Sequence, residues 1–266
     1  MVCRPSSKKI MNRINQLFEQ KKENILSVYF TAGFPKLEDT VPTLQSLQIN
    51  GVDLVEIGVP FSDPMADGIV IQNSSQQALQ NGMSIRKLFA QLTSVRAHIH
   101  IPLLMMGYLN PIIQFGFEAF CKECHRVGVD GMIIPDLPMS DFLAEYKVIA
   151  ERYGLEFIFL ITPETSEKRI RMIDSNTNGF IYMVSSAAVT GTQSSFDDKV
   201  DYFNRINAMN LKNPRLIGFG ISNKSTIDIV NYYSSGAIIG SAFIKALNET
   251  LDVEKGVKLL LERLKK

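Results

Sequence analysis

The chain has 266 residues, of which 45% are hydrophobic and 21% charged, and its formal net charge is +1. These totals allow a large core, and the balanced charge and the lack of any apolar stretch of roughly 20 residues argue against nucleic-acid and membrane partners. Three cysteines and no secretory signal favour a reducing, cytoplasmic setting.

The first predicted element is a helix over residues 8–21, in which Ile10, Ile14, Leu17 and Phe18 form one apolar stripe. Residues 1–10 are expected to form a flexible extension. After residue 24, short apolar segments alternate with helical stripes as far as a last helix that contains Val253 and Leu264. The predicted strands cover residues 25–31, 52–58, 102–108, 130–135, 155–161, 179–184, 215–220 and 236–240.

Eight strands that alternate with helices predict parallel pairing, with the helices outside the sheet. Eight is also the number that closes a barrel with a filled interior, so we expect one α/β domain over residues 1–266, a (β/α)8 TIM barrel with an extra N-terminal helix. An open doubly wound sheet is the alternative. It is disfavoured because no strand is followed by a GxGxxG turn and a helix.

The loop after the second predicted strand carries the acidic residues of most interest. Glu56 stands near the carboxyl end of a strand that reads as buried, and Asp67 follows eleven positions later in a loop stiffened by Pro60 and Pro64. A buried charge is costly unless it is bonded or functional, and an acid on a strand beside one on a loop suits gated proton transfer. The alternatives are that a backbone donor satisfies Glu56 and that Asp63 and Asp67 are solvated.

Two glycine-rich turns follow the seventh and eighth predicted strands, at 218–222 and 240–242. This is the usual phosphate site of a TIM barrel, because glycines let backbone N–H groups approach an anion; the alternative is that these glycines only form tight turns. No lysine stands clearly at a strand end and no residues have metal-ligand spacing. The residues therefore favour a cofactor-free proton transfer on a phosphorylated substrate.

Two further motifs are interpreted as structural. The run from Cys121 to His125 matches the C-x-x-C-H form of haem attachment, but Cys121 and Cys124 share a helical stripe with Phe117 and are expected in the core. His98 and His100 precede the third strand and are expected on the surface, at the end of the barrel away from the site.

Several segments together resemble one family closely, the alpha chain of tryptophan synthase. The most specific is the run from Glu56 to Gly68. The supporting segments are 30–33, 107–111, 135–138, 189–191 and 218–222. The chain departs from the usual family pattern at Ile69, where proline is usual, and at Ala188, where glycine is frequent, and these changes are expected to alter rates without abolishing activity.

The resemblance implies a lyase that cleaves indole-3-glycerol phosphate to indole and glyceraldehyde 3-phosphate in tryptophan biosynthesis. It implies that Glu56 is the general acid/base and that Asp67 holds the indole N–H. The implied substrate-binding residues are Tyr29, Tyr108, Tyr182, Thr190, Gly191, Gly220, Gly240 and Ser241. For the three tyrosines, plain packing is the alternative.

The same resemblance implies a heterotetramer of two alpha and two beta chains. The beta chain would hold pyridoxal phosphate and receive indole, whereas this chain would need no cofactor and no metal. Asp63, Pro64 and Asn110 are the residues expected to face the partner. Two alternatives remain open: a stand-alone lyase that works without a partner, and a non-catalytic barrel that activates the beta chain.

Overall fold

The computed structural model describes residues 11–185, 196–218 and 220–265, with residues 196–199 described by their backbone alone. The predictions for residues 1–10, Ala188, Thr190 and Gly191 lie outside these ranges.

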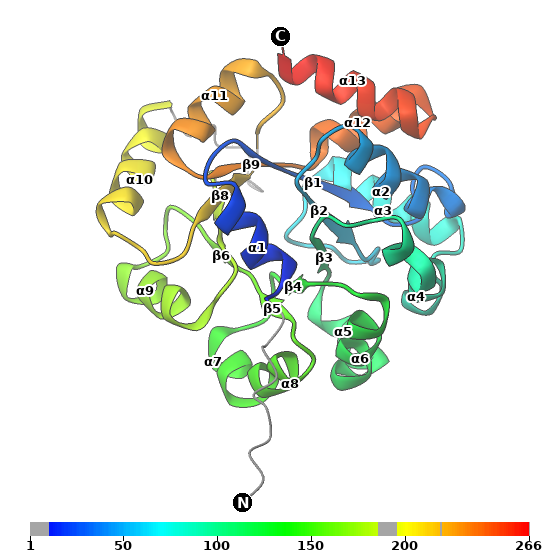
Figure 1. Ribbon diagram of the computed structural model, residues 1–266, viewed down its shortest axis with the longest axis horizontal. Helices are drawn as coiled ribbons and strands as arrows, with labels where there is room; N and C mark the ends of the chain where they lie inside the picture. The colour runs from blue at the N-terminus through cyan, green and yellow to red at the C-terminus, as the bar shows by residue number, and fades with distance from the viewer. Residues whose placement is uncertain (1–10, 186–195, 219, 266) are drawn as a thin grey trace, which may run out of the picture.

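The strands form one parallel sheet that curves into a barrel surrounded by helices, which confirms the predicted fold (Figure 1). Its order is β5-β4-β3-β2-β1-β9-β8-β7-β6. The strands are β1 Ile25–Thr31, β2 Leu54–Gly58, β3 Leu103–Met106, β4 Gly131–Ile133, β5 Glu156–Phe157, β6 Phe159–Ile161, β7 Ile181–Val184, β8 Arg215–Gly218 and β9 Gly236–Ile239.

The nine strands correspond to the eight predicted ones because β5 and β6 are two halves of one segment. Phe157 pairs with Met132 of β4, whereas Phe159 pairs with Ile181 of β7. Between them, the N–H of Ile158 still donates to the carbonyl of Met132, at 2.9 Å. The chain thus changes its bonded neighbour at Ile158, and this change closes the barrel.

The helices connect successive strands on the outside of the barrel. The α-helices are α1 Arg13–Gln20, α2 Thr40–Ile49, α3 Ile69–Gln80, α4 Ile85–Gln91, α5 Leu109–Phe115, α6 Phe117–Val127, α7 Met139–Asp141, α8 Lys147–Arg152, α9 Glu167–Asn176, α10 Phe196–Ala208, α11 Lys224–Tyr233, α12 Ser241–Thr250 and α13 Val253–Lys265. Two short 3-10 helices, Leu37–Asp39 and Leu92–Ala97, and one π-helical turn, Phe142–Tyr146, complete the set.

Helix α1 lies across the N-terminal end of the barrel (Figure 1). Its Ile14 and Phe18 are buried against the inward-facing side chains of the strands, and the Phe18 and Phe180 ring centroids are 5.7 Å apart. Buried Asp130, just before β4, accepts hydrogen bonds from Arg13 and Arg96 at 2.9 and 2.5 Å. Because apolar packing and these bonds close one end of the barrel, the opposite end is left for a site.

The outer core lies between the sheet and the helices, and it contains both described cysteines. Cys121 and Cys124 are fully buried on α6, in the stripe that the sequence predicts. His98 and His100 are exposed, as predicted. Among the described helices, none is both long enough and apolar enough to cross a membrane.

Candidate active site

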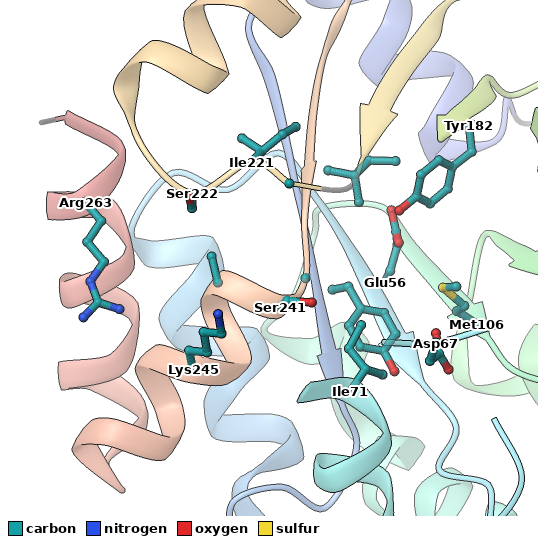
Figure 2. Close-up of a pocket in the computed structure, with 15 residues that line it drawn as sticks. Glu56, Asp67, Ile71, Met106, Tyr182, Ile221, Ser222, Ser241, Lys245 and Arg263 are labelled. Carbon is teal, nitrogen blue, oxygen red and sulfur yellow. The ribbon is translucent and has the colours of Figure 1, made fainter. Parts of the chain in front are cut away.

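A cavity of about 270 Å³ opens at the carboxyl ends of the strands (Figure 2). Glu56 and Tyr182 lie at one end of it and Lys245 and Arg263 at the other, with Ser241 between them. The lining residues are Tyr29, Glu56, Asp67, Ile71, Met106, Tyr182, Gly220, Ile221, Ser222, Ile238, Gly240, Ser241, Ala242, Lys245 and Arg263. The fold therefore brings together two acids, tyrosines and glycine-rich turns that are far apart in the sequence.

Glu56 is wholly buried on the inner face of β2, beside Tyr29 in the register with β1. The Ser27 hydroxyl donates a hydrogen bond of 2.9 Å to its Oε1 atom. The other oxygen, Oε2, has no hydrogen-bond partner among the described residues. Burial raises the pKa of Glu56 to about 8, although the Ser27 hydrogen bond lowers it. The carboxyl is therefore mostly protonated at neutral pH.

Asp67 lies at the end of the loop after β2, just before Gly68 caps α3, and it is nearly buried. The Tyr108 hydroxyl donates to its Oδ2 atom at 3.0 Å, and the same hydroxyl accepts the N–H of Ala66 at 3.0 Å. Burial raises the pKa of Asp67 to about 6, against the lowering effect of the Tyr108 hydrogen bond. Asp67 is therefore mostly ionised at neutral pH, unlike Glu56.

The three tyrosines occupy different positions around these acids. Tyr29 and Tyr182 are buried in the cavity lining, and burial raises the pKa of both above the ordinary range. Gly58 and Gly218 leave the space that the two rings fill, because a β-carbon at either glycine would collide with the hydroxyl of Tyr29 or Tyr182. Tyr108 lies instead in a small adjoining pocket with Asp67.

The N-terminus of α12 forms one wall of the cavity. Gly240 caps this ten-residue helix without a side-chain hydrogen bond. The first amide that donates within the helix is that of Phe243, to the carbonyl of Gly240, so the amides of Ser241 and Ala242 before it have no intrahelical acceptor. Gly220, whose φ is +78°, and Ser222 line the cavity beside them. Amides without an intrahelical acceptor, at the positive end of a helix dipole, suit an anion such as a phosphate group.

Comparisons with known proteins place the chain in one family. A sequence model of the tryptophan synthase alpha chain family matches residues 15–265. The chain belongs to the tryptophan synthase alpha chain family.

Individual alpha chains match over nearly the whole length. The alpha chain of Parabacteroides distasonis is 60% identical over 256 residues, which cover 96% of this chain and all of that relative. The alpha chain of Flavobacterium johnsoniae is 59% identical and covers 90% of this chain and 95% of its own length. The crystal structure of the Legionella pneumophila alpha subunit superposes with a TM-score of 0.87 at 32% identity, over 96% of this chain and 97% of that one.

Membership of the tryptophan synthase alpha chain family makes this chain the lyase that cleaves indole-3-glycerol phosphate in tryptophan biosynthesis. It also implies a beta chain as its partner in a complex. Of the alpha-chain positions expected to face that partner, Asp63 and Asn110 are exposed, whereas Pro64 is buried in the pocket beside Tyr108.

Sequence reasoning did not identify three polar residues of this alpha-chain site: Ser27, Lys245 and Arg263. Ser27 stands two positions before Tyr29, so strand alternation places both on the inner face. Lys245 follows Ser241 by four positions, which places both on one face of α12. Arg263 comes from α13 and is paired with Glu249 at 2.6 Å, so no local pattern in the sequence could have revealed it.

Proposed function

We propose that Glu56 and Asp67 carry out the retro-aldol cleavage of indole-3-glycerol phosphate in this cavity. Glu56 gives its proton to the indole ring carbon that bears the glycerol chain, and positive charge develops on the ring. The carbon–carbon bond then breaks, and its electron pair returns to the ring to give indole. The glycerol hydroxyl loses its proton to the Glu56 carboxylate and becomes the carbonyl of glyceraldehyde 3-phosphate, so no other reactant is needed.

The observation that carries this proposal is the placement of two buried carboxyl groups, each with a different hydrogen-bond partner, in the lining of one cavity. A general acid works best when its pKa lies near the working pH, and burial brings the pKa of Glu56 to about 8. Asp67, with a pKa of about 6, is available as a carboxylate to accept the indole N–H and to stabilise the ring cation. Environments that separate the pKa values of two carboxyl groups assign the acid to one and the charge stabiliser to the other.

We propose that the substrate phosphate binds away from Glu56, in the part of the cavity between Ser241 and Lys245. The amides of Ser241 and Ala242 donate to it at the N-terminus of α12, with Gly220 on the facing turn. Tyr29, Tyr182 and Met106 enclose the indole between this end and Glu56. Anchoring the phosphate orients the reacting carbon toward the acid.

The pH dependence of kcat/KM tests the two acid assignments. We expect a bell-shaped profile that rises through about pH 6 as Asp67 ionises and falls through about pH 8 as Glu56 loses its proton. The second ionisation of the substrate phosphate also has a pKa of about 6, so it contributes to the acid limb as well. The alkaline limb is therefore the decisive one. A kcat/KM that stays flat from about pH 7 to about pH 9.5 would overturn the role of Glu56.

A second prediction concerns Lys245, which lines the phosphate end and forms no hydrogen bond or ion pair with any described residue. Lys245→Ala should raise KM about threefold to fivefold and leave kcat nearly unchanged, because an exposed charge adds little binding energy. The difference should shrink as the salt concentration rises. Lys258→Ala, an exposed lysine on α13 outside the cavity, is the matched control. An equal rise in KM in both variants would show that Lys245 has no specific role.

We further propose that the complex contains two alpha and two beta chains and works in the cytoplasm. The low cysteine count and the burial of both described thiols suit a reducing compartment. Exposed Asp63 and Asn110 follow β2 and β3 at the carboxyl end of the barrel, where we place the partner. Pyridoxal phosphate would belong to the beta chain, and this chain would act without a cofactor.

A further inference from the structure

Ser27 places a hydroxyl group inside the barrel, on a strand whose other side chains are mostly apolar. It lies on β1 opposite Leu54 in the register with β2, and it is wholly buried. Its neighbours Leu26 and Val28 belong to the outer core, so Ser27 alternates to the inner face, where Ile25 also lies. Its hydroxyl donates to Oε1 of Glu56 at 2.9 Å and makes no other hydrogen bond with the described residues.

A buried hydroxyl without a partner is costly, and alanine or valine would fill this position without that cost. The bond to Glu56 is therefore what the serine contributes to this strand. From this geometry we propose that Ser27 is a positioning residue: its hydroxyl holds Oε1 of Glu56 and leaves Oε2 as the oxygen that exchanges the proton with the substrate. This inference rests on the proposed role of Glu56 as the acid.

The direction of the hydrogen bond decides which oxygen carries the proton. In the proposed arrangement Ser27 donates to Oε1, so that atom is the carbonyl oxygen of the neutral acid and Oε2 carries the proton. Oε2 is buried and has no hydrogen-bond partner among the described residues. Its bond to the proton breaks as the ring carbon is protonated, and the resulting carboxylate takes back the proton of the glycerol hydroxyl. The carboxyl returns to its starting state without a further reactant.

Apart from burial, the hydrogen bond from Ser27 is the main influence on the pKa of Glu56. The other titratable groups around Glu56 are two tyrosines and Asp67. Tyr29 from β1 and Tyr182 from β7 interact with Glu56 electrostatically, and both keep their protons through the working range because burial raises their pKa. Asp67 lines the same cavity from the loop before α3, and no described cation forms an ion pair with Glu56. The Ser27 hydrogen bond favours the ionised form, so its loss should raise the pKa of Glu56.

Ser27→Ala and Ser27→Thr test this inference by two readouts. The titration of the Glu56 carboxyl is followed by ¹³C NMR of glutamate-labelled enzyme, with its signal assigned by its absence in Glu56→Gln. We expect Ser27→Ala to raise the pKa of Glu56 by about one unit and to lower kcat about tenfold, with KM nearly unchanged. Ser27→Thr keeps the hydroxyl and should restore both values, and the melting temperature of each variant shows that the barrel has formed.

Thr43→Val is the matched control, because Thr43 is equally buried, lies on α2 and has a hydroxyl without a partner. It should leave the Glu56 titration and kcat unchanged. A folded Ser27→Ala enzyme with the wild-type pKa of Glu56, or with a kcat equal to or above the wild type, would overturn the inference. Full activity in Glu56→Gln would contradict the proposed function itself, in which Glu56 is the acid. An inactive Glu56→Gln beside an unaltered Ser27→Ala would reject the role of Ser27 alone.

Discussion

Replacing Glu56 with glutamine should lower kcat for indole release about a thousandfold, with KM changed little. Glutamine has nearly the same shape and can still accept the hydrogen bond from Ser27, but its amide cannot give a proton to the ring carbon. The loss should therefore fall on the chemical step and leave substrate binding in place. Indole release from indole-3-glycerol phosphate, followed at saturating substrate, measures the change directly.

Glu123→Gln provides the control for this substitution. Glu123 lies on α6, away from the cavity, and pairs with Arg126 at the surface. The same change of a carboxyl to an amide there should leave kcat as it is. A Glu56→Gln enzyme that keeps more than about a tenth of the wild-type kcat would show that another group supplies the proton.

Replacing Asp67 with asparagine should lower kcat about a hundredfold. Asparagine can still accept the indole N–H and the Tyr108 hydroxyl through its oxygen, but it carries no charge to stabilise the ring cation. The acid limb of the kcat/KM profile reflects the ionisation of both Asp67 and the substrate phosphate. In Asp67→Asn only the phosphate should still titrate, so the acid limb should become shallower. Steady-state kinetics over the pH range test both effects.

The control for Asp67 is Asp141→Asn, a change at an exposed acid on α7. It should alter neither kcat nor the acid limb. If Asp67→Asn raised KM alone and left kcat unchanged, Asp67 would be a binding group without a part in stabilising the transition state.

The sequence contained most of the fold because each strand is short, apolar and followed by a helix. It did not reveal that residues 155–161 form two strands, since the change of neighbour at Ile158 depends on barrel closure. It also did not predict α5, a short helix that contains Pro111 and ends at its C-cap, Gly116. Pro111 is compatible with the first turn of that helix, where its missing N–H would have no intrahelical acceptor.

The site was predictable where one loop carries several functional residues, as between Glu56 and Asp67. It was less predictable where a residue acts through a neighbouring strand. Nothing local in the sequence shows that Ser27 meets Glu56, because that contact depends on the parallel register of β1 and β2. The cation of Arg263 reaches the cavity only through the packing of α13 against α12. The roles assigned to Thr190 and Gly191 stay predictions.

The central claim is that this barrel cleaves indole-3-glycerol phosphate as the partner of a beta chain. The most direct measurement is indole release by the purified chain, alone and after addition of a tryptophan synthase beta chain. We expect slow release alone and an increase of at least about fivefold with the beta chain. Fast release that the beta chain does not alter would identify a stand-alone lyase. No release in either setting, with beta-chain activity still stimulated, would contradict the catalytic account and leave a regulatory barrel.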